Sequence, residues 1–351
     1  MQFKKSDLDN AVAAVSEGLS NNSYVKLSTT ISLYPSNGKL FLVTAPEDGE
    51  VWYSAEVGTM DEECPAVSVD GAQFAKAVSC CSDIVSLKIT NDSLIIGNGK
   101  GELTLAIVID DDTNKPACHD FFTPTGDALT VAHLNQLKLV SGSTMQTMDS
   151  IALKTVYTDA DVAFSTDQSN ISKGDSIVNV PMLLSARMLS FLGKHGDTAV
   201  LDAGQEFFWF VSEKDKCVAR FSKLFQDFLP EFPVEELKSV FAQPVKYSVN
   251  IDLAVFIKAL NFLSVVASGT DDYAVTLAQE QPGELIISCG ANNMQKIPCE
   301  QLSGDGPWSV SIDCTSAVKK FSQYNGKVQL DVYNDQLALV GPVTTAIGLL
   351  I

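Results

Sequence analysis

The segment at residues 247–260 reads YSVNIDLAVFIKAL and contains the pattern that decides the fold. Its first half alternates apolar and polar residues, as a half-buried strand does, and its second half places apolar residues at helical spacing. Asp252 stands at the junction between the halves, where an acidic side chain suits the N-cap of a helix. The segment therefore predicts a short strand that runs directly into an amphipathic helix.

Five other segments show the same strand-to-helix pattern: residues 2–15, 67–78, 129–139, 177–189 and 308–321. Alternating segments joined by turn-forming residues lie between them, most clearly around Asn37-Gly38, Asn91-Asp92 and Asn334-Asp335. Recurrence at roughly this spacing indicates a repeat architecture. The sequence therefore predicts six copies of one half-unit, with chance similarity among short alternating segments as the alternative.

Two polar segments that contain proline interrupt the repeats, at residues 109–126 and 229–244. Such segments between periodic regions are typical of connectors. They divide the 351 residues into three similar domains, which we place at residues 1–122, 123–241 and 242–351. This number of domains agrees with a usual size of about 100 to 200 residues per domain.

The net charge of −19 excludes a protein that is basic overall, such as a simple DNA-binding module. An average surface of this charge repels nucleic acid, so any contact with DNA must come from a locally basic face. The first residues lack the apolar stretch of a signal peptide, and no apolar run approaches the roughly 18 residues of a membrane span. We therefore expect a cytoplasmic protein without a membrane partner.

No residue pattern indicates a catalytic or metal site. The eight cysteines have no CxxC spacing, and the three histidines do not complete a zinc pattern with them. The acidic run at residues 110–112 lacks an EF-hand loop, and residues 97–101 lack the Gly-Lys-Ser/Thr ending of a phosphate loop. We expect no enzymatic activity, no metal and no cofactor. A hydrolase assembled from distant residues is the alternative, which activity screening would reveal.

Three tandem domains of two strand-helix-sheet halves, in an acidic chain of this length, resemble the bacterial sliding clamps, the β subunits of DNA polymerase III. The resemblance covers essentially the whole chain and rests on the order of elements rather than on a short motif. It implies an α+β fold in which helices line the inside, and sheets the outside, of a closed ring of six domains from two chains. The scarcity of arginine, present only at Arg187 and Arg220, suits a divergent or phage-encoded member.

The resemblance also implies a function. Members of this family are non-enzymatic processivity factors that encircle double-stranded DNA without reading its sequence, and they bind DNA polymerase and the clamp loader. An acidic scaffold or decoy that binds replication proteins without encircling DNA is an alternative. The two-domain clamps of eukaryotes and archaea, built from three chains, are a further alternative that the chain length disfavours.

A ring around DNA needs cationic side chains on its inward helices, because phosphates provide most of the sequence-independent attraction. Every predicted half-unit supplies such side chains. The candidates are Lys4, Lys5, Lys76, Lys138, Arg187, Lys194, Lys258, Lys319 and Lys320. An ordinary solvated lysine is the alternative at each position, but recurrence in all six copies of an acidic chain favours a DNA-facing set.

Two identical chains that close head to tail need complementary edges on the first and third domains. The resemblance implies that strand edges meet there with a small apolar contact. Alignment with the family places this contact on Leu103, Leu105, Phe262 and Leu263. Ordinary domain core is the alternative for these four residues.

The resemblance finally implies a cleft between the second and third domains, lined by the C-terminal segment, that binds short linear peptides of partners. The family's Thr-Asp-Gly-His-Arg-Leu motif corresponds here to TDQSNI at residues 166–171, which departs at three central positions and loses the basic residue. The candidate cleft residues are Met148, Thr166, Gln168, Asn170, Ile171, Pro230, Glu231, Phe232, Ile347, Leu349 and Ile351. Domain core is again the alternative.

Overall fold

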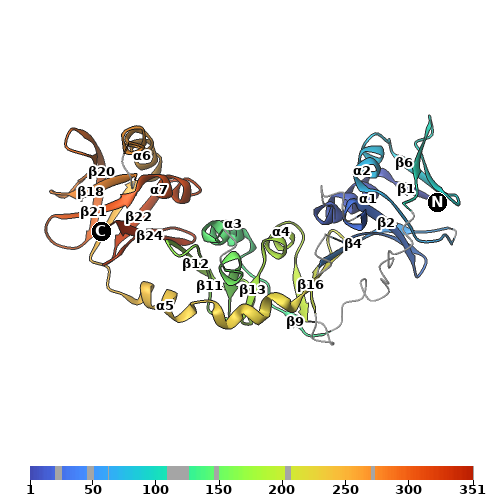
Figure 1. The fold of residues 1–351 in the computed structure, drawn as a ribbon, viewed down its shortest axis with the longest axis horizontal. Coiled ribbons are helices and arrows are strands. Elements are labelled where there is room, and N and C mark those ends of the chain that lie inside the picture. Colours follow the sequence, from blue (N-terminus) through green and yellow to red (C-terminus); the bar gives the residue numbers. More distant parts are fainter. Residues whose placement is uncertain are drawn as a thin grey trace. The chain divides into compact units, whose positions relative to one another are not determined.

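The computed structural model describes residues 1–19, 26–45, 51–61, 63–108, 126–145, 150–201, 207–269 and 273–350. The chain forms two compact units (Figure 1). Unit 1 contains Met1–Val131 and Ser190–Leu224, and unit 2 contains Ala132–Leu189 and Phe225–Ile351. The division into three domains stays a prediction. None of the helices in the described ranges is long and apolar enough to cross a membrane.

A helix follows a strand in all six predicted half-units, which confirms this order of elements; in the third, residues 130–136 separate the strand from its α-helix, so the strand does not run directly into it. The pairs are β1 Gln2–Lys4 with α1 Lys5–Val15, β5 Val67–Asp70 with α2 Gly71–Ser79, β9 Ala128–Leu129 with α3 Leu137–Val140, β13 Met182–Leu184 with α4 Ala186–Lys194, β17 Tyr247–Asp252 with α6 Leu253–Ala267, and β21 Trp308–Asp313 with α7 Cys314–Phe321. Asp70, Asp252 and Asp313 cap their helices, because each carboxylate accepts hydrogen bonds from backbone N–H groups of the first turn.

The fourth half-unit starts later than its sequence pattern predicts. The pattern places a strand at residues 177–181 and puts Pro181 in the first helical turn, whereas both β13 and α4 begin beyond this segment. Thr158 explains the difference. Its Oγ1 accepts hydrogen bonds from the backbone N–H groups of Ile177 at 3.0 Å and Val178 at 3.3 Å, which holds these apolar residues in a buried loop.

The predicted connector at residues 229–244 is largely helical, which the sequence pattern did not indicate. It contains the end of the 3-10 helix η7 Lys223–Glu231 and the helix α5 Val234–Ala242. Pro230 and Pro233 interrupt the helical spacing, and Pro233 stands at the N-cap of α5. Shorter 3-10 helices are η1 Ser16–Gly18, η2 Lys26–Thr29, η4 Leu134–Gln136, η5 Ser141–Ser143 and η6 Ala152–Lys154.

Unit 1 contains two antiparallel sheets. The smaller has the order β1-β6-β7-β8, with β6 Ile84–Ile89, β7 Ser93–Gly97 and β8 Glu102–Ala106. The larger has the order β5-β2-β3-β4-β16-β15-β14-β9, with β2 Thr30–Ser36, β3 Lys39–Thr44, β4 Val51–Thr59, β14 Thr198–Leu201, β15 Phe207–Ser212 and β16 Cys217–Ser222. The predicted turn between β2 and β3 is present, and Asn37 and Gly38 both have the positive φ that a tight hairpin requires.

Unit 2 contains a twelve-stranded arrangement of order β13-β10-β11-β12-β24-β21-β18-β19-β20-β17-β22-β23. The strands not yet defined are β10 Val156–Thr158, β11 Val162–Thr166, β12 Asn170–Asp175, β18 Ala274–Gln279, β19 Glu284–Cys289, β20 Asn293–Ser303, β22 Lys327–Val332, β23 Gln336–Val340 and β24 Thr344–Leu350. The last strand is the central junction, because β24 pairs with β12, β21 and β23. The buried hydroxyls of Ser172 and Thr345 meet across β12 and β24 at 3.2 Å.

Candidate functional site

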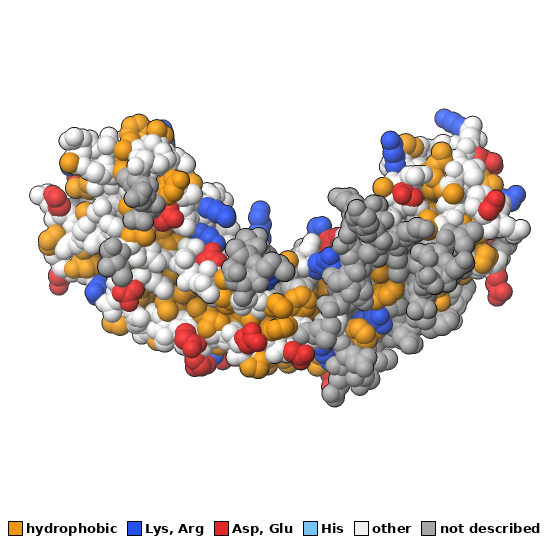
Figure 2. Space-filling model, in the orientation of Figure 1, with side chains coloured by type: hydrophobic (Ala, Val, Ile, Leu, Met, Phe, Trp, Pro, Cys, Tyr) orange, Lys and Arg blue, Asp and Glu red, His pale blue; other side chains and the backbone are white. Residues whose placement is uncertain are grey.

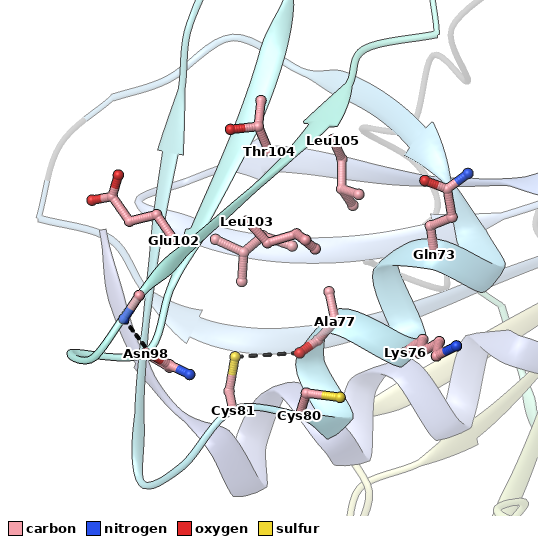
Figure 3. A pocket seen from close by; sticks show the side chains of 12 residues that line it. Gln73, Lys76, Ala77, Cys80, Cys81, Asn98, Glu102, Leu103, Thr104 and Leu105 are labelled. Atoms are coloured by element: carbon pink, nitrogen blue, oxygen red, sulfur yellow. Dashed lines mark hydrogen bonds between the residues drawn. The ribbon is translucent and has the colours of Figure 1, made fainter.

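An apolar cavity of about 510 Å³ lies beside β8, an edge strand of the smaller sheet of unit 1. Figure 3 shows Leu103 and Leu105 on β8 across from Ala77 on α2. The Leu103 side chain is 47% exposed and that of Leu105 is 5% exposed. Lys76 on α2 and the two cysteines that follow this helix, Cys80 and Cys81, also line the cavity. An edge strand presents backbone N–H and C=O groups with which a strand of another chain can pair.

Helix α6 in unit 2 has one buried face and one exposed apolar face. The exposed face carries Val255, Phe262, Val265 and Val266, and these positions share one side of a helix. Phe262 is 62% exposed and Val265 is 76% exposed. The exposed Lys258 lies among them on the same side of the helix. Several exposed apolar side chains on one helix face are typical of a protein interface.

The structure separates the four predicted interface residues into two groups. Leu103 and Phe262 lie at the surface, whereas Leu105 and Leu263 are buried in the cores of their own units. Leu103 and Leu105 are two residues apart on β8 and share one face, with Leu105 the more covered of the two, whereas the 100° step between helix neighbours turns Leu263 away from Phe262. Of the four residues, Leu103 and Phe262 are the two whose side chains a partner can reach.

The predicted DNA-facing residues also differ in environment. Five are exposed, and the described residues offer them no ion pair: Lys4, Lys76, Lys138, Lys258 and Lys319. Lys5 forms an ion pair with Asp9, and Lys194 forms one with Glu17 at 2.5 Å. Arg187 is half-buried. Within the predicted set, these five lysines are therefore both exposed and unpaired with any carboxylate of the described residues.

Lys320 does not have the exposure that a DNA contact requires. Its residue is only 5% exposed. The Nζ atom donates hydrogen bonds to the carbonyl oxygen of Gly142 at 2.6 Å and to Asp167 Oδ2 at 3.0 Å. The expectation that this side chain faces DNA is corrected accordingly: in this structure its ammonium is satisfied inside unit 2.

The predicted cleft residues divide into a buried group and a surface group. Ile171 and Phe232 belong to one hydrophobic cluster, in which the rings of Phe232 and Tyr157 stack at 5.4 Å. The other buried members are Thr166, Asn170 and Ile347, and the members at least partly exposed are Gln168, Pro230, Glu231 and Leu349. Met148 and Ile351 lie outside the described residues.

The turn between β11 and β12 carries three of these residues and has a distinctive geometry. Gln168 has a φ of 77°, a left-handed conformation that is uncommon for a residue other than glycine. Thr166 Oγ1 accepts a hydrogen bond from the backbone N–H of Gln168 at 3.0 Å, and donates to the carbonyl oxygen of Asn170 at 2.8 Å. These bonds hold the turn without the glycine that the family motif has at this position.

A second cavity, of about 460 Å³, lies at the end of β24 and is lined by Leu349. Its aromatic lining comes from Tyr247, Trp308 and Tyr333. The rings of Tyr247 and Trp308 stack at 5.8 Å, and the indole N–H of Trp308 donates to Gln279 Oε1 at 2.9 Å. Apolar walls with a few fixed polar groups are typical of a binding pocket. The sequence patterns had not indicated these three aromatic residues as cleft candidates.

A scan against protein-family models and a search of curated proteins both find no match. Solved structures, in contrast, match along the whole chain. The β chain of DNA polymerase III from Streptococcus pneumoniae has a TM-score of 0.80 at 14% identity, covering 100% of this chain and 99% of that one. The chain has the fold of a bacterial sliding clamp.

Two further clamps support this assignment. The β subunit from Thermotoga maritima gives a TM-score of 0.80 at 11% identity, and the sliding clamp from Bacillus subtilis gives 0.78 at 14% identity. Each comparison covers 100% of this chain and 98% of the other. The α+β class and the resemblance to this family are confirmed as statements about the fold.

The clamp fold also shows why part of the site escaped the sequence patterns. Tyr247 and Trp308 were correctly placed at the starts of predicted strands, but a strand pattern does not say which strands become neighbours. Only the pairing of β24 with β21, Leu349 opposite Ile312, brings the C-terminal residues beside them. The aromatic residues that begin the two strands preceding the helices of the third predicted domain, Tyr247 and Trp308, were the signal present in the sequence.

Proposed function

We propose that the protein is a non-enzymatic processivity factor, which closes as a head-to-tail dimer around double-stranded DNA and tethers DNA polymerase. The observation that carries the proposal is a match in fold to sliding clamps over 100% of the chain. The clamp loader is the second expected partner, the cytoplasm the expected location, and no cofactor takes part.

Ring closure is supported by two unlike apolar surfaces on one chain. One is the cavity beside Leu103 on β8, and the other is the exposed face of α6 around Phe262. Unlike surfaces form heterologous contacts, which close into a ring when the rotation between copies permits. Burying one phenylalanine side chain contributes about 1.5 to 3 kcal/mol, so several apolar side chains at each contact offset part of the entropy that association costs.

Encirclement of DNA is supported by a separation of charge within unit 2. Figure 2 shows Lys and Arg side chains over α3 and α7, the helices that carry Lys138 and Lys319, and Asp and Glu side chains along α5. A local basic surface attracts phosphates even when the whole chain has a charge of −19. Lysines that contact phosphates do not read the base sequence, which suits a protein that must slide along DNA.

We expect the double variant Lys138→Glu/Lys319→Glu to leave a nicked circular plasmid faster than the wild type after loading. Loss of two phosphate contacts should also lower the salt-dependence slope by about 1.8. The measurement is the lifetime of the loaded protein across a salt series. The matched control is Lys88→Glu/Lys327→Glu, which changes two exposed lysines on strands. Equal lifetimes for the wild type and the helix variant at every salt concentration would argue against a basic lining.

A further inference from the structure

Two consecutive lysines near the end of α7 have opposite environments. Lys319 is exposed, whereas Lys320 is 5% exposed and bonded to Gly142 and Asp167. A buried ammonium is costly unless it is paired and hydrogen-bonded, and removal of one partner of such a pair is strongly destabilising. The ammonium of Lys319 is therefore accessible to solvent, whereas that of Lys320 is bound inside unit 2.

The partner carboxylate, Asp167, belongs to the turn between β11 and β12. Its Oδ1 accepts hydrogen bonds from the backbone N–H groups of Asn170 at 2.8 Å and Ser169 at 3.2 Å. The amide nitrogen of the Asn170 side chain adds a further bond at 2.9 Å. Because Oδ1 fixes the turn while Oδ2 binds Lys320, one carboxylate connects α7 to the turn.

The same turn is attached to the C-terminal strand. The carbonyl oxygen of Ser169 accepts a hydrogen bond from the backbone N–H of Gly348 at 3.0 Å. Asn170 stands opposite Ile347 in the pairing of β12 with β24. A continuous series of polar contacts thus leads from Lys320 through the turn to the strand that carries Leu349.

From these contacts we infer that Lys320 is a positioning residue of the partner-binding cleft and not a DNA contact. Its ammonium holds the Asp167 turn, which carries the predicted cleft residues Gln168 and Asn170, in its present conformation. The inference rests on the proposed function, because it assumes that partner peptides bind beside this turn. It places a DNA-facing lysine and a cleft-positioning lysine next to each other on one helix.

The test compares Lys320→Met with its neighbour Lys319→Met in the full chain. We expect Lys320→Met to speed hydrogen exchange in residues 166–171 by roughly tenfold or more, because a buried pair is broken. It should also weaken binding of a fluorescent peptide from the polymerase's C-terminal tail by roughly tenfold or more, with the lifetime on DNA unchanged. Lys319→Met should shorten that lifetime and leave both other quantities unchanged.

Two further variants distinguish positioning from general support of the fold. If Lys320 acts through Asp167, Lys320→Met/Asp167→Asn should bind the peptide no more weakly than Lys320→Met alone. Ser248→Ala, which removes a buried bond to Asp331 elsewhere in unit 2, should lower thermal stability without changing peptide affinity. Wild-type exchange and wild-type peptide affinity in Lys320→Met would overturn the inference. Failure of the wild type itself to bind the peptide would count against the proposed function instead, while hydrogen exchange would still decide whether Lys320 holds the turn.

Discussion

Replacing Phe262 by Glu is expected to halve the mass of the protein in solution, from twice the chain mass of 37.7 kDa to 37.7 kDa. Phe262 is 62% exposed on α6, so the substitution should be tolerated by the isolated fold. In the proposed dimer, the new carboxylate would be removed from water in the apolar contact around Leu103. Such a charge costs about 3 to 5 kcal/mol, which raises the dissociation constant by a factor of roughly 100 to 1,000 or more.

The mass should be measured by sedimentation equilibrium at micromolar concentration. Leu103→Glu should have the same effect, because it places a charge on the opposite surface of the same contact. The matched control is Met294→Glu, which changes an apolar side chain that is 51% exposed on β20 instead of α6, and which should leave the dimer intact. Dimers of unchanged stability in both Phe262→Glu and Leu103→Glu would show that these surfaces do not form the contact.

Replacing Leu349 by Glu is expected to weaken binding of the polymerase's tail peptide by about 30-fold or more while the dimer persists. Leu349 is half-buried in the cavity of about 460 Å³ that Trp308 and Tyr333 also line. Apolar anchors usually dominate peptide binding, and removal of one such anchor costs 2 kcal/mol or more, about a 30-fold loss of affinity. Fluorescence anisotropy with the labelled peptide measures this loss directly.

As a test of peptide binding, a change at the half-buried Leu349 is preferable to a change at Ile171. That residue is 5% exposed in the hydrophobic cluster of unit 2, so an aspartate would test folding rather than binding. Leu302→Glu, an exposed apolar position on β20, is the control that should keep full peptide affinity. If Leu349→Glu binds the peptide as tightly as the control, the cavity at the end of β24 is not the partner site.

The repeats could be predicted from sequence because their signals are local. Alternation, helical spacing and a capping carboxylate such as Asp252 all depend on residues within one segment. Residues 177–181 show the limit of this approach, because the hydroxyl of Thr158, about 20 residues earlier in the chain, holds Ile177 and Val178 in a loop. Local patterns therefore gave the order of elements but not every boundary.

Whether an individual site residue is exposed or buried depends on contacts between segments that are far apart in the sequence, which no local pattern contains. Lys320 looks like any other lysine of the basic set until Asp167 and Gly142, 153 and 178 residues away, are brought beside it. Phe262 differs from its buried neighbour Leu263 in the direction of its side chain, and Leu103 differs from Leu105 on the same strand face in how far packing covers it. Family alignment could place the candidate contacts, but only the structure separates surface from core.

The central claim is that the protein encircles DNA, and topological retention on a plasmid tests it most directly. The protein should be loaded onto a nicked circular plasmid by its clamp loader, separated from free protein by gel filtration, and divided into two samples. One sample is then linearised with a restriction enzyme. The account predicts that protein stays with the circular DNA and is released from the linear DNA. Equal retention on both forms, or no retention on the circle, would contradict encirclement and favour a scaffold that binds replication proteins without enclosing DNA.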